Sequence, residues 1–443
     1  MTKTTVMYAY NIKLNKFLYP SLLLLFLFAC RVDRIDDPNN PSPDLVAANA
    51  TLAEIQNLVD GSESGMRINM NFYFDDVSVI GREYYRFSTS DPRFTSDLLG
   101  KGSAILDNNT FYITNPFAAR YRVIKNANIL IDALTNTTAL ITPDQRRGGI
   151  AYAKTIQAHQ LLLVYNLLYN NGVRVDVKNP DQLGPFLNRQ QSIDAIFNLL
   201  NEANADLKSN TATFPFTTTL YSDTADVFSK FNRALAARVA IYRQDWAGAN
   251  TALAESFFSL TGDLNTGAYH LFSLQGGDLL NTMYFPPNSS GEARVAHPSF
   301  VTDAEPGDQR VANKVSLRTA AEFQDGLSSN YDLSLYKTNT APIPIIRNEE
   351  LVLIYAEVKA QQGDPTEALK GINRVRNAAG LGNYGGPTDQ ASLINEILKQ
   401  RRYSLFGEGH RWIDLRRYNR LSTLPIDRTG DDVWEQFPIP ANE

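Results

Sequence analysis

The sequence predicts a mainly helical protein whose helices are interrupted by two long, loop-rich insertions. Helix-start signals recur along the chain, and two helix–turn–helix units follow in its second half. The insertions, at about 68–115 and 261–345, are rich in Gly, Pro, Asn, Ser and aromatic residues and lack a sustained helical period. Because 443 residues can bury a sizeable core, we expect residues 49–443 to form one domain.

Helix-start signals predict where the first helices lie. Thr51 and Glu54 form a capping box, in which each side chain satisfies a backbone N–H at the helix start, and this helix is expected to continue through Val59. The Gly- and Ser-containing stretch 61–65 then predicts a polar turn. Further helices are predicted at about 116–134, 142–169 and 192–207.

Two helix–turn–helix units, at about 232–258 and 347–379, carry the repeat signal. In the second unit, the turn Gly363-Asp364-Pro365 supplies a C-cap glycine, an N-cap and a first-turn proline. Each unit places two alanines twelve residues apart across its turn: Ala237 with Ala249, and Ala356 with Ala368. This spacing is typical of tetratricopeptide-type helix pairs, whose backbones approach closely, so we predict irregular pairs of that type.

The N-terminus has the pattern of an exported, lipid-anchored protein. Lysines without acidic residues precede the apolar run 17–29, as in a secretory signal, and thirteen residues are too few to span a bilayer comfortably. The single cysteine, Cys30, follows directly, as in the lipobox of bacterial lipoproteins. We predict a signal peptide at 1–29, lipidation of Cys30 and a flexible tether at 30–48. The alternatives are an ordinary cleaved signal, an uncleaved anchor and a buried structural cysteine.

Composition argues against several classes of function. The formal charge of −5 gives no electrostatic reason to expect nucleic acid as a partner, and one cysteine rules out a disulfide framework or a Cys-rich metal site. The four histidines are scattered without metal-ligand spacing, so we expect no metal and no cofactor. The acidic pairs at 75–76 and 431–432 predict solvated loops, with calcium binding as a minor alternative.

The C-terminal residues carry a distinctive series of motifs, at 343–357, 368–381, 401–417 and 437–443. The third reads Arg-Arg-Tyr-Ser-Leu-Phe-Gly-Glu-Gly-His-Arg-Trp-Ile-Asp-Leu-Arg-Arg. This ordered series closely resembles the SusD/RagB family of nutrient-uptake outer-membrane lipoproteins. The resemblance extends upstream through 121–128, 158–169 and Asp245-Trp246, and so covers most of the mature chain.

Charged residues of the third motif are expected to be structural. This set is Arg401, Glu408, Arg411 and Asp414. The last three lie three residues apart, close enough for ion pairing in a helix, and apolar neighbours predict a partly buried network. Gln400 and Ser404 stand where the family commonly has glutamates, so this network is expected to be reduced. Glu408 and His410 as the acid and base of an active site are the less favoured alternative.

The family resemblance implies a function. SusD-like proteins have a mostly helical fold of tetratricopeptide-like pairs and lie over a SusC-like TonB-dependent transporter in the outer membrane of Bacteroidetes-type bacteria. They capture oligosaccharides, or in some members peptides, and pass them to the channel. The resemblance therefore implies a nutrient-binding lipoprotein at the cell surface, and acidic residues just after Cys30 resemble the signal for surface export.

The insertions are where we expect the ligand, because sugar rings stack on aromatic side chains and their hydroxyls need polar neighbours. The candidate aromatic residues are Phe94, Phe111, Tyr112, Tyr269, Tyr284 and Phe285. The candidate hydroxyl partners are Arg93, Asn108 and Asn288. Neither insertion contains tryptophan, so a peptide or another nutrient remains open as the ligand.

Two other classes of function remain as alternatives. A helical-repeat scaffold would bind other surface proteins through a concave helical face and take no small ligand. A surface glycoside hydrolase would need two carboxylates about 5 to 10 Å apart in a cleft. Since the sequence shows no catalytic constellation, we predict a binding protein and not an enzyme.

Overall fold

The computed structural model describes residues 42–441 and 443, and Asp44–Glu443 group into one unit. The predicted signal peptide, Cys30 and the tether as far as Pro41 lie outside the described residues. The last part of the predicted tether is a short helix, α2 (Pro43–Asn49), and not an extended link. None of the helices in the described range combines the length and apolar character needed to cross a membrane.

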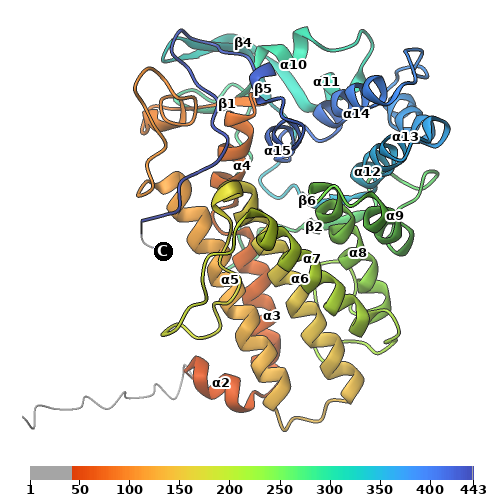
Figure 1. The fold of residues 1–443 in the computed structure, drawn as a ribbon. Helices are drawn as coiled ribbons and strands as arrows, with labels where there is room; N and C mark the ends of the chain where they lie inside the picture. The colour runs from red at the N-terminus through yellow and green to blue at the C-terminus, as the bar shows by residue number, and fades with distance from the viewer. Residues whose placement is uncertain (1–41, 442) are drawn as a thin grey trace, which may run out of the picture. The chain divides into compact units, whose positions relative to one another are not determined.

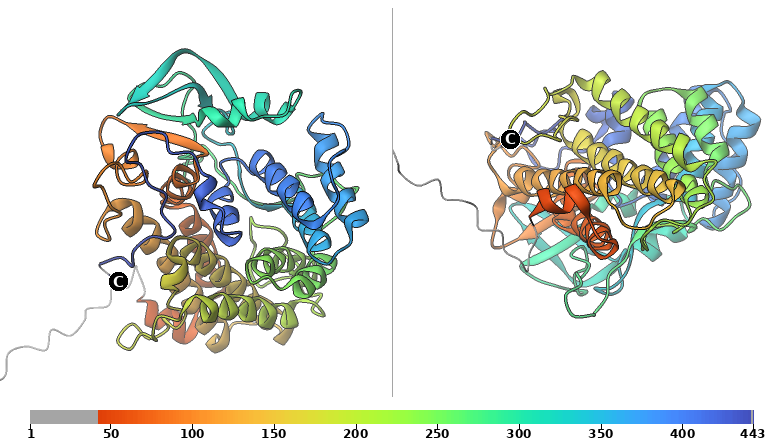
Figure 2. Two further views of the ribbon diagram at one scale, coloured as in Figure 1. Left: turned by 45° about the horizontal axis from the view of Figure 1, so that its top comes forward. Right: turned by 90° about the horizontal axis from the view of Figure 1, so that it is seen from below.

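A stack of antiparallel helices forms the N-terminal half of the unit. Each helix packs against the next, and Figure 1 shows the stack in the lower part of the view, with the same helices side by side from below in Figure 2. Capping boxes start α6 at Thr142 and Gln145 and α7 at Asn188 and Gln191, which confirms the local signal at 142. The helices are α3 (Leu52–Arg67), α5 (Phe111–Asn136), α6 (Pro143–Leu168), α7 (Arg189–Leu207), α8 (Ala225–Tyr242) and α9 (Trp246–Glu255).

The C-terminal helices continue this packing, with α12 against α8 and α9. They are α12 (Asn348–Gln361), α13 (Pro365–Ala378), α14 (Gln390–Ser404) and α15 (Arg411–Arg417). Ala356 and Ala368 lie in one buried cluster between α12 and α13. A Cβ atom at Gly371 would lie 2.9 Å from the Cβ of Ala356, so these backbones approach closely. The mainly helical fold with tetratricopeptide-like pairs is therefore confirmed.

The two insertions meet in a small antiparallel sheet. Its strand order is β1-β3-β5-β4, and β1 from the first insertion pairs with β3 from the second, with Tyr84 opposite Ala296. The four strands are β1 (Tyr84–Ser88), β3 (Glu292–Ala296), β5 (Leu327–Leu333) and β4 (Val315–Gln324). A second sheet pairs β2 (Gly267–His270) with β6 (Ile343–Arg347). Short helices complete the fold: α4 (Met70–Ile80), α10 (Pro298–Thr302), α11 (Gln309–Lys314), η2 (Pro92–Phe94), η3 (Tyr169–Asn171) and η4 (Leu421–Thr423).

Two local predictions in the N-terminal part are wrong. The stretch 61–65 is not a turn, because α3 continues to Arg67. Gly65 is there for packing: a Cβ atom would lie 2.9 Å from Cγ2 of Val123 on α5. The first insertion is not wholly irregular either, since α4 occupies 70–80 and α5 already begins at Phe111.

The acidic pairs were predicted as solvated loops, and this holds only for Asp432, which is exposed in irregular backbone, because Asp75, Asp76 and Asp431 are buried. Asp75 and Asp76 are fully buried in α4, and the guanidinium of Arg294 on β3 donates to Asp75 at 2.6 and 2.8 Å. Asp431 is also buried and pairs with Arg428 at 2.9 Å. The partner of Asp75 lies on a distant strand, which no local pattern could show, whereas Arg428 is only three residues from Asp431.

Candidate ligand-binding surface

Phe111 lies at the centre of a cluster that contains most of the predicted ligand residues. Its ring centroid is 5.1 Å from that of Phe94, 5.3 Å from that of Phe72 and 5.6 Å from that of Tyr112. The guanidinium of Arg86 joins Phe285 to this cluster, at 5.0 Å from the Phe94 ring and 4.9 Å from the Phe285 ring. We call Phe72, Phe94, Phe111, Phe285, Arg86 and Arg93 the aromatic platform.

The inner layer of the platform is buried and fixed. Phe94 is only 5% exposed, and Tyr112 beneath Phe111 is fully buried, so both support the surface and cannot themselves form an open face. Arg86 is held by an ion pair with Glu292. Burial opposes ionisation of Glu292, but hydrogen bonds from Ser88, Arg86 and Ser90 outweigh it and lower the pKa of Glu292 to about 2.

The outer layer offers aromatic faces to solvent. Phe72, Phe111 and Phe285 are partly exposed, and the exposed Arg93 lies 4.8 Å above the Phe111 ring while Asp91 binds its guanidinium at 2.6 and 2.9 Å. An arginine over an aromatic face holds the ring in place without burying it. Polar side chains lie next to these rings in the sequence. Asn71 precedes Phe72 and Thr282 precedes Phe285 by three residues, and the Thr282 hydroxyl donates to the side-chain oxygen of Asn71 at 3.2 Å.

The remaining candidates lie outside the platform. Tyr284 is partly buried next to Phe285, and Asn108 is exposed, its carbonyl accepting from the N–H of Ala441 at 2.9 Å. Asn288 is exposed, but its side-chain oxygen already accepts a hydrogen bond from the backbone N–H of Thr319 at 2.7 Å.

Tyr269 lines a separate cavity of about 680 Å³, together with Tyr336. Five basic and three acidic side chains also line it, so much of its charge is compensated. Burial lowers the pKa of Lys314 in this wall to about 8, although Glu408 lies 3.9 Å from its Nζ.

Sequence reasoning missed Phe72, Arg86 and Arg294 as parts of this surface. Arg294 lies 4.8 Å from the Phe285 ring while its guanidinium binds Asp75. Phe72 lies inside the predicted insertion, but no sequence signal distinguished it from core phenylalanines. The two arginines face each other across β1 and β3, at paired positions, so only the strand register reveals them.

The C-terminal charged motif is a buried ion-pair network, although one expected pairing is wrong. Asp414 accepts from Nε of Arg401 at 2.6 Å and from Nε of Arg417 at 3.0 Å. Glu408 instead accepts from Arg347 at 2.8 Å, and Arg411 donates to the Arg82 carbonyl oxygen at 2.7 Å.

The cause of that difference is the backbone between Glu408 and α15. Gly407 and Gly409 adopt φ values of +72° and +81°, which turn the chain so that Glu408 does not share a helix with Arg411. Nη1 and Nη2 of Arg401 are buried with no hydrogen-bond partner in the described part of the chain. Within 42–441 and 443, no group of three or more His, Cys, Asp or Glu side chains is placed to hold a metal ion.

Parts of this sequence match a known protein family and a known protein. Residues 318–437 match the model of the SusD family. The SusD-like protein P38 from Formosa agariphila is 31% identical over 150 residues, which are 30% of this chain and 29% of that protein, so the match spans less than a third of this relative's length. The platform residues lie outside 318–437, and their roles cannot be carried over from the family match.

Solved structures match over most of the chain. Surface glycan-binding protein A from Bacteroides thetaiotaomicron superposes with a TM-score of 0.68 at 17% identity, covering 88% of this chain and 96% of that one. A structure of a protein of that name in complex with laminarihexaose gives a TM-score of 0.66 at 16% identity, with the same coverage. A SusD superfamily protein from Bacteroides vulgatus gives 0.66 at 15% identity, again covering 88% and 96%. This chain therefore carries a C-terminal segment that matches the SusD family model, and it shares the fold of SusD superfamily structures over most of its length.

Proposed function

We propose that this chain is a cell-surface lipoprotein that captures oligosaccharides on the aromatic platform and delivers them to a SusC-like TonB-dependent outer-membrane transporter. It acts by binding and not by catalysis. The single observation that carries the proposal is the set of partly exposed rings around Phe111, held from behind by Arg86 and Phe94. Such a rigid apolar face with polar groups beside it suits the C–H face and the hydroxyls of a sugar.

The rigidity of the platform matters for affinity. Its rings come from α4, the start of α5, η2 and the segment before β3, and the pairing of β1 with β3 ties these segments together. Because the rings are already ordered, a sugar that stacks on them costs little further conformational entropy in the protein.

Surface location and partner are part of the same proposal. The lipobox-like sequence ending at Cys30 supports an outer-membrane lipid anchor, and an anchored ligand-binding domain would lie beside its transporter. Leu271, Leu274 and Leu280, between β2 and β3, are 49%, 78% and 43% exposed. Exposed leucines in one segment favour contact with another protein, so they are the surface we propose for that partner. They also keep the scaffold alternative open.

The test is isothermal titration of the purified chain with neutral oligosaccharides and with peptides, repeated for Phe111→Ala. Loss of one stacking ring is expected to cost about 0.5–1.5 kcal/mol of binding free energy, or roughly a 2- to 12-fold weaker Kd. The matched control is Phe323→Ala, which removes a 72% exposed phenylalanine on β4, outside the platform, and is expected to leave Kd unchanged.

Three results would redirect the proposal. Equal loss of affinity in both variants would place the ligand elsewhere. Binding of peptides alone would change the ligand class. Failure of every small ligand, together with co-purification of a partner protein, would favour the scaffold. Chromatography of the titrated sugars checks the absence of catalysis, since shortened products would show a hydrolase.

A further inference from the structure

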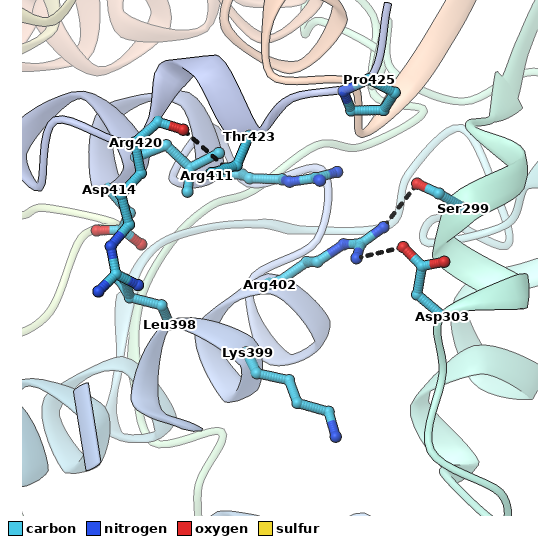
Figure 3. A pocket seen from close by; sticks show the side chains of 11 residues that line it. Ser299, Asp303, Leu398, Lys399, Arg402, Arg411, Asp414, Arg420, Thr423 and Pro425 are labelled. Carbon is cyan, nitrogen blue, oxygen red and sulfur yellow. Dashed lines mark hydrogen bonds and ion pairs between the residues drawn. The ribbon is translucent and has the colours of Figure 1, made fainter. Parts of the chain in front are cut away.

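A second cavity, of about 560 Å³, lies between α14, the start of α15 and the end of α10 (Figure 3). Arg402 comes from α14 and Arg411 from the start of α15, and Figure 3 shows both side chains reaching toward the same space beside Ser299. Arg402 donates to the Ser299 hydroxyl at 2.7 Å and to Asp303 at 3.0 Å. The two guanidinium groups therefore share one cavity.

The charges that line this cavity do not balance. Four side chains are cationic: Lys399, Arg402, Arg411 and Arg420. Only two are acidic, and Asp414 is already bound by Arg401 and Arg417, neither of which lines the cavity. The other acid, Asp303, is 52% exposed, so water screens its attraction for Arg402. Lys399 is itself paired at 3.0 Å with Glu305, which does not line the cavity, so the excess positive charge rests on the three arginines.

Arg411 is the least compensated of these cations. Its hydrogen bond goes to the neutral Arg82 carbonyl, and no carboxylate in the described part of the chain forms a salt bridge with it. Burial, reinforced by the neighbouring charge of Arg402, lowers the pKa of Arg411 to about 9. Glu83 attracts Arg411, but burial raises the pKa of Glu83 to about 7, so this carboxyl is partly protonated at neutral pH.

Arg402 contributes a further free donor. Its Nε is buried and has no hydrogen-bond partner among residues 42–441 and 443. A buried donor without a partner costs free energy, and two like charges facing one space repel each other. An anion between them would relieve the repulsion.

We propose that this cavity binds an oxyanion, a sulfate or carboxylate group, between the guanidinium groups of Arg402 and Arg411. Guanidinium groups bind such groups through paired, charge-assisted hydrogen bonds, and the Ser299 hydroxyl adds a neutral partner. A volume of about 560 Å³ exceeds that of a bare ion and leaves space for a sugar that carries the charge. The site is separate from the aromatic platform and does not depend on its proposed role.

The experiment measures binding of sodium sulfate to the purified full chain by calorimetry and thermal unfolding, against sodium chloride of equal ionic strength. Wild-type protein is expected to bind sulfate and to gain thermal stability with its concentration. Arg402→Gln and Arg411→Gln are each expected to weaken binding about tenfold or more, because each removes a charged hydrogen-bonding group.

A matched control removes a cation elsewhere. Arg147→Gln on α6 takes away one guanidinium that is 53% exposed and paired with Asp144, and it is expected to leave sulfate affinity unchanged. Should Arg411→Gln unfold, Arg402→Gln and Lys399→Gln still test the site, and the Lys399 side chain is 38% exposed, so its replacement is expected to leave the fold intact. Thermal unfolding in chloride checks that each variant is folded.

The source of the anion is tested with oligosaccharides of one length that are neutral, carboxylated or sulfated. Tighter binding of the charged sugars, lost in Arg402→Gln, would identify the anion as part of a glycan. Binding of free sulfate alone would identify an ion site. Absence of both, or equal affinity in all variants, would overturn the proposal. Phe111→Ala should retain sulfate binding and Arg402→Gln should retain neutral-sugar binding, so the two proposals fail separately.

Discussion

The C-terminal ion-pair network and the aromatic platform use arginine in opposite ways. In the network, Arg401 and Arg417 share Asp414, and Arg417 also binds Glu357, with every partner largely buried. On the platform, the exposed Arg93 lies over an aromatic ring and pairs with an aspartate at the surface. The first arrangement fixes helices, since a buried charge tolerates one geometry. The second keeps rings in place while leaving them free to meet a ligand.

The largest expected loss of stability comes from a substitution in the C-terminal ion-pair network. Asp414→Asn removes the carboxylate that Arg401 and Arg417 share, and leaves Arg401 buried without an anionic partner. We expect a loss of about 3–5 kcal/mol in the free energy of unfolding, measured in urea. The control is Asp144→Asn in an ion pair more than half exposed, which should cost less than about 1 kcal/mol. Similar losses in the two variants would show that burial does not distinguish these pairs.

Acid is expected to lower the free energy of unfolding by a smaller amount, because His270 and His410 are buried and resist protonation in the folded protein. Burial lowers the pKa of His270 to about 3 and of His410 to about 4. The unfolded chain takes up these protons near pH 6.5, whereas the folded protein does not, so the histidines favour unfolding as pH falls from 6.5 toward 4. Each contributes about 1.4 kcal/mol per pH unit. Glu83 acts oppositely between about pH 7 and 4.5, because its pKa is raised on folding.

A variant isolates one histidine from these opposing groups. His270→Leu removes a side chain whose Nε2 is buried without a partner among the described residues. Between pH 6.5 and 4.5, its unfolding free energy should fall by about 2–3 kcal/mol less than that of the wild type. Identical pH profiles for the two proteins, measured by urea unfolding at each pH, would show that folding does not lower the pKa of His270.

The smallest of these effects concerns the close approach of the two backbones in the α12–α13 helix pair. Gly371→Ala places a methyl group 2.9 Å from both the Cβ of Ala356 and the carbonyl oxygen of Val352. We expect a loss of about 1–3 kcal/mol in thermal or urea unfolding. Gly382→Ala has no atom within 4 Å and should be nearly neutral. A neutral result at Gly371 would mean that α12 and α13 can separate without cost.

Local sequence signals predicted the helical scaffold but not the contacts that assemble the aromatic platform. Helix ends depend on nearby residues, so Thr142 and Gln145 predict the start of α6. The position of Gly65 in a helix depends on Val123 of another helix, which no window around residues 61–65 contains. Likewise, the sequence predicted Phe94 and Phe285 as candidates but not their contact through Arg86, which requires the pairing of two distant strands.

The same pairing governs the order in which the molecule forms. The helix pairs contain mostly sequence-local contacts, whereas β1 must await β3, which is made only after α5 to α9. Contacts of large sequence separation form slowly because their loops are costly to close. During synthesis the helices α3 to α9 therefore precede the platform, and a chain truncated before β3 would lack both α12 to α15 and the sheet that brings Phe285 to Phe111.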